Sequence, residues 1–124
     1  GDIAPEELIG YEKRGGCLVQ EEYAVSDIYK GDKNIILFTK FIDRNGIKEE
    51  RILDYIITYC NKDEGILLCD CETAPGERDD RIIAKAVFID WEFIKVSKAW
   101  KINIDRLEIE NIGALNISYE NEGL

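Results

Sequence analysis

The sequence predicts an all-β fold, mainly antiparallel, with about eight strands arranged as a barrel or a sandwich and with a short N-terminal helix. Two observations support this prediction: twenty isoleucines accompany many Val, Tyr and Phe residues, and hairpin-length links separate the apolar runs. A third is the dipeptide Asn45-Gly46 between two such runs, which is typical of a hairpin turn. With 124 residues and no linker, repeat or low-complexity tract, residues 1–124 are expected to form one domain.

The N-terminal segment, residues 4–14, has the charge order of a helix. Pro5 stands at a first-turn position, acidic residues follow it, and basic residues come last, as a helix dipole favours. The pair Gly15-Gly16 would end such a helix. We therefore expect a short helix or a helical turn here, followed by strands from Cys17 onward.

The first long hairpin is expected around Asn45-Gly46, after two strands over residues 17–20 and 22–29. When Asn45 and Gly46 are the central residues of a type I′ turn, the indices of facing residues sum to 91. Phe38 then faces Leu53.

A second hairpin is expected over residues 52–71, with its loop at residues 61–65. Its register places Asp54 opposite Asp70, and both residues interrupt apolar runs. Two close carboxylates raise the pKa of one of them, an arrangement that suits acid–base catalysis or a hard cation. The competing interpretation is that both face solvent near an edge. Because like charges directly opposed destabilise a sheet, a register that differs by two residues is a further alternative.

Later strands are expected in four runs, over residues 81–90, 92–103, 107–112 and 115–119. In the central strands both faces are apolar, whereas a sheet with one face in water alternates apolar and polar residues. The second apolar face therefore needs a cover. The N-terminal helix, a second sheet or another subunit, and hence a homo-oligomer, would each provide one.

The four cysteines are Cys17, Cys60, Cys69 and Cys71. Structural zinc sites usually draw their ligands from two closely spaced cysteine pairs, and the one Cys-Asp-Cys sequence here argues against zinc. As disulfides, Cys17 would join one of Cys69 and Cys71, and Cys60 would join the other. The register of the second hairpin keeps Cys60 beyond reach of both, so buried thiols are the alternative.

The absence of histidine is the main argument against catalysis. It removes the commonest acid–base group near neutral pH and the commonest metal ligand. Residues 43–50 do not match a calcium loop, because Gly46 is fourth in the segment instead of sixth. Without a glycine-rich phosphate loop either, we expect no metal, no cofactor and no enzymatic activity.

The charge balance is acidic, with 16 Lys and Arg residues against 26 Asp and Glu residues and a net charge of −10. Nucleic acid is therefore not an expected partner. No apolar stretch approaches eighteen residues, so no membrane span is expected. The acidic surplus favours solubility, and it is also what would attract a basic protein.

The chain begins with Gly1 and contains no methionine. We expect that an N-terminal segment was removed, which was a signal peptide, a propeptide or an expression tag. Removal of a signal peptide predicts an exported protein, periplasmic or secreted, in a compartment where cysteines form disulfides. A cytoplasmic location is the alternative.

Four aromatic residues, Tyr55, Tyr59, Trp91 and Trp100, are candidates for contact with a ligand if the sheet closes around a small cavity. Packing in the core is the competing interpretation. Together with the two carboxylates of Asp54 and Asp70, these residues are the candidate binding residues.

These expectations favour a non-enzymatic acidic β domain that binds a protein or a small molecule as an interaction module. The first alternative is a cytoplasmic acidic inhibitor, of the immunity-protein type, that masks a basic protein by electrostatic complementarity. The second alternative is an enzyme that uses Asp54 and Asp70.

Overall fold

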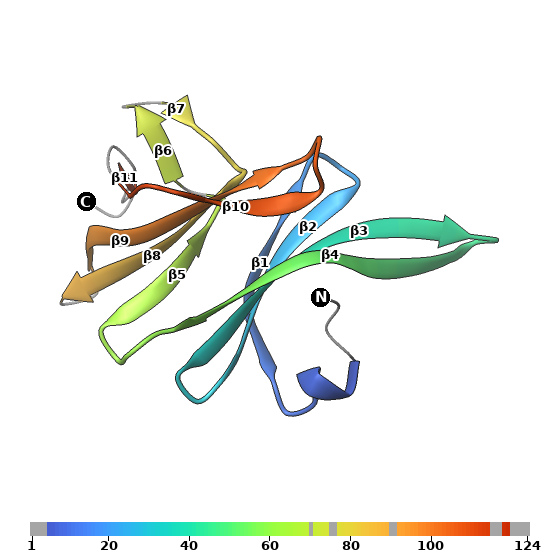
Figure 1. Cartoon of the computed structure of the whole chain (residues 1–124), viewed down its shortest axis with the longest axis horizontal. Coiled ribbons are helices and arrows are strands. Elements are labelled where there is room, and N and C mark those ends of the chain that lie inside the picture. Colours follow the sequence, from blue (N-terminus) through green and yellow to red (C-terminus); the bar gives the residue numbers. More distant parts are fainter. Residues whose placement is uncertain (1–4, 70, 75–76, 90–91, 115–117, 120–124) are drawn as a thin grey trace. The chain divides into compact units, whose positions relative to one another are not determined.

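A computed structural model describes residues 5–69, 71–74, 77–89, 92–114 and 118–119. By its internal contacts the chain divides into two compact units, residues 1–59 and residues 60–124. Both units are built from antiparallel strands (Figure 1), which confirms the predicted fold class. That the whole chain forms one domain stays a prediction.

The first unit consists of a short 3-10 turn and four strands: η1 (Pro5–Leu8), β1 (Glu12–Val19), β2 (Tyr23–Lys30), β3 (Lys33–Arg44) and β4 (Ile47–Tyr59). The strands of the second unit are β5 (Glu64–Leu68), β6 (Cys71–Ala74), β7 (Glu77–Arg78), β8 (Ile82–Ile89), β9 (Glu92–Asn103), β10 (Glu108–Ile112) and β11 (Ser118–Tyr119). Each unit contributes one four-stranded sheet, which accounts for the eight main strands.

In the first unit, β1 to β4 form one antiparallel sheet in sequence order. Consecutive residues of a strand point to opposite faces. Ile36 and Phe38 on one face, and Ile35 and Thr39 on the other, are at most 2% exposed. The two-sided apolar pattern of the sequence therefore corresponds to burial of both faces at the centre of this sheet.

The β3–β4 hairpin turns at Asn45 and Gly46, whose φ angles are +54° and +82°. Positive φ at both central residues is the conformation of a type I′ turn, as the Asn-Gly pair predicts. The predicted register is correct from this turn to the pair formed by Thr39 and Ile52.

Both edge strands of this sheet contain a β-bulge. In β4 the extra residue is Leu53, so that Phe38 faces Asp54 and the predicted Phe38–Leu53 pair is wrong. In β1 the extra residue is Arg14. A bulge shifts the register by one residue and twists an edge strand, which hinders its pairing with another chain.

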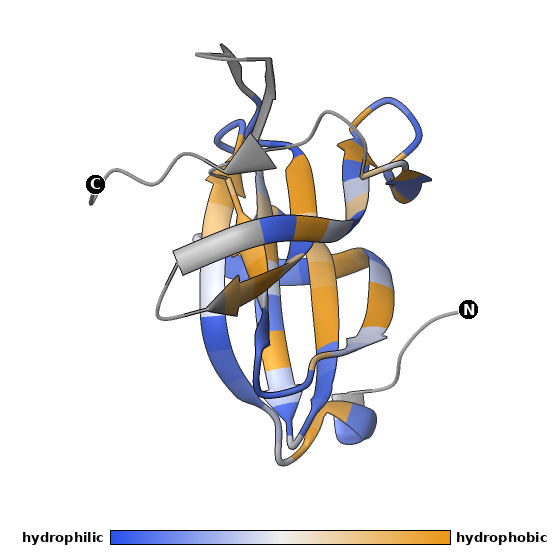
Figure 2. Ribbon diagram, turned by 90° about the vertical axis from the view of Figure 1, so that its left-hand side faces the viewer, coloured by the Kyte–Doolittle hydropathy of each residue, from blue (hydrophilic) through white to orange (hydrophobic). Residues whose placement is uncertain are grey.

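In the second unit the larger sheet has the order β10-β9-β8-β5, and a smaller one has the order β11-β6-β7. Along the strands apolar segments alternate with hydrophilic ones, and hydrophilic colours gather at many of the turns (Figure 2). One face of the larger sheet is a cluster of small and branched apolar side chains. Its buried members are Leu67, Ile82, Ala84 and Ala86, with Val96 and Ile112 packed against them.

The predicted second hairpin is wrong. The β5 strand pairs with β8, where Leu67 faces Ala84, and not with β4. Of the expected loop at residues 61–65, residues 61–64 form a turn, in which the Glu64 N–H donates to the Asn61 carbonyl oxygen at 3.1 Å, and β5 begins at Glu64. This turn follows the boundary between the two units. The predicted opposition of Asp54 and Asp70 therefore has no basis in the strand pairing.

The predicted N-terminal helix is limited to the 3-10 turn of Pro5–Leu8, and Glu12–Val19 is a strand. The backbone pairing offered by β2 outweighs the weak helical preference of a segment that contains two glycines. Each four-stranded sheet is open, with two edge strands, so neither is closed into a barrel.

Candidate functional site

The predicted pair of carboxylates, Asp54 and Asp70, is not supported by the strand pairing. Asp54 lies on β4, half-buried, and its Oδ1 accepts a hydrogen bond of 2.8 Å from the N–H of Tyr55. Such a local hydrogen bond next to a β-bulge provides an acceptor for a backbone N–H where the regular pairing between strands is interrupted. Asp70 lies outside the described residues.

The aromatic candidates fall on different elements. Tyr55 and Tyr59 lie on one face of β4 in the first unit, where Tyr55 is half-buried and Tyr59 is 57% exposed. Trp100 lies on β9 in the second unit, where it is 7% exposed and faces Ile83. Trp91 lies outside the described residues. Burial of Trp100 is the position expected of a core residue, and its role in binding stays a prediction.

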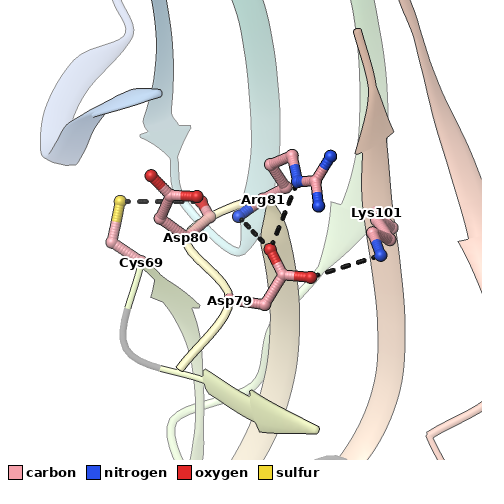
Figure 3. Close-up of polar contacts among 5 residues, drawn as sticks. All are labelled: Cys69, Asp79, Asp80, Arg81 and Lys101. Carbon is pink, nitrogen blue, oxygen red and sulfur yellow. Dashed lines mark hydrogen bonds and ion pairs between the residues drawn. The ribbon is translucent and has the colours of Figure 1, made fainter. Parts of the chain in front are cut away.

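Among the cysteines, Cys17 and Cys69 are disulfide-bonded and Cys60 is a buried thiol. The Sγ atom of Cys69 lies 3.8 Å from the carbonyl oxygen of Asp80 (Figure 3). An oxidised sulfur has no hydrogen to donate, so this approach is a contact and not a hydrogen bond. The structure does not describe the side chain of Cys71.

The first unit contains a buried carboxyl group, Asp27 on β2, which is 2% exposed. Its Oδ1 accepts a hydrogen bond of 2.8 Å from Nδ2 of Asn34, itself 1% exposed. Burial raises the pKa of Asp27, while the Asn34 hydrogen bond and the charge of Arg14 act to lower it. Sequence reasoning missed this pair, although a charged residue inside the apolar run of β2 was a visible signal.

A second carboxylate, Asp79, is held by cations at the start of β8 (Figure 3). It lies 3.2 Å from Lys101 Nζ and 3.4 Å from Arg81 Nε, and it accepts a hydrogen bond from the Arg81 N–H at 3.0 Å. Burial alone would raise the pKa of Asp79, but these hydrogen bonds and charges outweigh it and lower the pKa. The cluster ties the loop before β8 to β9, which is a structural role.

A third ionic contact joins neighbouring strands of the second unit. Lys85 Nζ on β8 lies 3.5 Å from a carboxylate oxygen of Glu64 on β5, and both side chains are less than a fifth exposed. Removing one partner of such a pair leaves the other charge poorly solvated and uncompensated.

The β3–β4 hairpin extends past the rest of its sheet (Figure 1). The pairing of β3 with β2 ends at Lys40 and Tyr23, and the Phe41 N–H makes a last bond of 2.9 Å to the Glu22 carbonyl oxygen. Beyond this point β3 pairs with β4 alone. We call residues 41–51 the arm.

The arm is exposed over most of its length, and one apolar side chain lies beside its turn. Ile47, beside the turn, is 67% exposed, and Phe41, at the base, is 38% exposed. Residues 43–51 are all classed as exposed. The arm is therefore a protruding two-stranded ribbon with an exposed Ile side chain beside its turn.

No family model, curated protein or solved structure matches this chain. Among the described residues no group of side chains is arranged to hold a metal ion. The described part of the chain also lacks any helix with the length and apolar character needed to cross a membrane.

Proposed function

We propose that the chain is a non-enzymatic interaction module that binds a protein partner through the arm. The observation that carries the proposal is the 67% exposure of Ile47 at the end of a ribbon that has left its sheet. Two-stranded ribbons are marginally stable in water. A partner that buries Ile47 gains about 1–2 kcal/mol from that side chain alone, and it orders the ribbon.

The bulges at Arg14 and Leu53 favour recognition through side chains over strand addition. Strand addition needs an edge with a regular row of unpaired backbone groups. Both edges of this sheet are interrupted, and the β4 edge carries the charged run Lys48 to Arg51. Such features protect an edge from pairing. The partner is therefore expected to contact the faces of the arm.

A non-catalytic role is supported by the partners of the shifted carboxyl groups. The pKa of Asp27 is raised by burial and the group is fixed by Asn34, and Asp79 is bound by two cations of its own sheet. Both shifts have structural causes. The carboxylate-pair enzyme is not proposed, because the strand register that suggested it is wrong.

A second candidate is an inhibitor that masks a basic protein, and the net charge of −10 favours it. Its binding would be dominated by long-range attraction, so its affinity would fall steeply as salt is raised. Binding through Ile47 and the few charges of the arm would depend on salt much less steeply. The slope of the affinity against ionic strength therefore separates the two candidates.

An exported location is part of the proposal and is supported by the disulfide-bonded Cys17 and Cys69. Disulfides persist in the periplasm or outside the cell and are rare in the cytosol. Quantifying thiols after denaturation without reductant, in protein isolated from its native compartment, tests this. Four thiols per chain would contradict export.

The test of function uses a photo-crosslinking amino acid at position 47, with position 18 as the control. Leu18, on β1, is 63% exposed and lies outside the arm. The protein captured at position 47 is purified, and its Kd for the chain is measured with the Ile47→Asp and Leu18→Asp variants. We expect Ile47→Asp to raise the Kd about 5- to 30-fold and Leu18→Asp to leave it within about twofold. An equal effect of both variants would refute the arm as the binding surface.

A further inference from the structure

The two faces of the arm carry different charges, as the register determines. Facing residues share a face of a ribbon. Within the arm, the face that contains Ile47 is formed by Ile42, Arg44, Ile47, Glu49 and Arg51. The opposite face is formed by Phe41, Asp43, Lys48 and Glu50. The first set, which we call the Ile47 face, has two cations and one carboxylate, whereas the second has one cation and two carboxylates.

The carboxylates of the arm are already engaged within the chain. Glu49 lies 3.5 Å from Arg44 Nε, Asp43 Oδ1 accepts the Gly46 N–H at 3.0 Å, and Glu50 Oε1 accepts the Thr39 hydroxyl at 2.6 Å. Because Glu49 and Arg44 pair with each other, the charge that the Ile47 face offers to a partner is that of Arg51. Within the described part of the chain the Arg51 side chain makes no hydrogen bond or ion pair. The offered charge is therefore positive, in a chain of net charge −10.

The tip lies four residues beyond Lys40, which corresponds to about 13 Å along a strand. This distance exceeds the Debye length of about 8 Å at physiological ionic strength, so the charges at the base of the arm act only weakly on a group bound at Ile47. Arg51, which pairs with Lys40, lies at the base of the arm, where the end of a bound segment would meet it.

We propose that the Ile47 face binds an acidic, amphipathic segment of a protein partner. Apolar side chains of the segment cover Ile47 and Ile42, and its carboxylates meet Arg51 and Arg44. This inference rests on the proposed function and adds the chemistry of the partner.

The probe is a fluorescein-labelled amphipathic peptide built from Leu and Glu, and its binding to the full chain is followed by fluorescence anisotropy. Because the chain is strongly acidic, binding of an acidic peptide runs against the overall charge and reports a local site. We expect Arg51→Glu to weaken binding about five- to tenfold. The matched control is Lys48→Glu, with the same charge change on the opposite face, which leaves the Kd within about twofold.

No binding of the acidic peptide, or an equal effect of the two charge reversals, would overturn the inference. The same variants are measured against the protein captured at position 47. If Ile47→Asp weakens that complex while Arg51→Glu strengthens it, the partner is basic, and the proposed function survives without the acidic segment. If concentration-dependent association of the chain with itself is abolished by Arg51→Glu and the peptide does not bind, the occupant is a second copy and the inference is wrong.

Discussion

Replacing Asp27 separates two contributions of its buried carboxyl group, the hydrogen bond that it accepts and the charge that it carries. Asp27→Ala removes the acceptor of the 2.8 Å bond from Asn34, whose amide is 1% exposed. Leaving a buried donor unsatisfied costs about 1–3 kcal/mol. Asp27→Asn keeps an oxygen at that position and removes the charge. At neutral pH we therefore expect the Asn variant to exceed the Ala variant in stability by about 1–3 kcal/mol, and at least to equal the wild-type protein.

The pH dependence has a definite sign. Burial raises the pKa of Asp27 above its ordinary 3.8, so the folded protein holds this proton to a higher pH than the unfolded chain does. The stability gained from the protonated group is complete below 3.8 and is lost as the pH rises through the folded pKa. The wild-type protein should therefore gain stability relative to the Asn variant as the pH is lowered from neutral.

Urea denaturation of the wild-type protein and both variants, followed by far-ultraviolet circular dichroism at about pH 7 and about pH 4.5, measures these differences. Circular dichroism is used because both tryptophans lie in the second unit, whereas Asp27 lies in the first. The Asn variant serves as the control for the charge and the Ala variant for the hydrogen bond. Equal stability of the two variants at neutral pH, or a difference between the wild-type protein and the Asn variant that is independent of pH, would refute the reasoning.

Three further predictions concern the backbone angle at Gly46 and the ion pairs of Asp79 and Glu64. Gly46→Ala should cost about 1–2 kcal/mol in urea denaturation because of the positive φ alone, whereas Gly113→Ala, where a Cβ also has open space, should change stability by less than about 1 kcal/mol. Asp79→Asn should cost about 1–2 kcal/mol at neutral pH, and because the pKa of Asp79 is lowered, this loss should vanish as the pH falls through that pKa. Glu64→Gln removes the carboxylate that pairs with Lys85 and should lower the melting temperature through a loss of about 3 kcal/mol. Most of that stability should return in the double variant with Lys85→Met, and no recovery would contradict the pairing.

The elements that the sequence predicts best are those set by neighbouring residues. The turn at Asn45 and Gly46 depends on two positive φ angles, which this dipeptide adopts readily. Its register is correct up to Thr39 and Ile52, since a hairpin fixes the pairs next to its turn. Nothing in the sequence around Leu53 indicates a β-bulge. The predicted pairs farther from the turn than Thr39 and Ile52 are therefore displaced by one residue.

The errors arise where distant parts of the chain compete. The turn at residues 61–65 has the composition of a hairpin loop, but β5 finds its partner in β8, and that choice depends on packing in the second unit. Similarly, residues 12–14 have the charge order of a helix end, yet pairing with β2 places them in a strand. The hairpin that forms the arm could be predicted from the sequence. Its extension beyond the sheet could not, because it depends on where the pairing of β2 with β3 stops, which is at Tyr23, the first residue of β2.

The central claim, that a partner binds the arm, is tested most directly by amide hydrogen exchange of the chain alone and in complex with the purified protein captured at position 47. In the chain alone, residues 42–49 should exchange faster than residues 35–38, which lie in the buried centre of β3. In the complex, slowing should be concentrated in residues 41–51. Slowing elsewhere in the described chain, with the arm unchanged, would contradict the account.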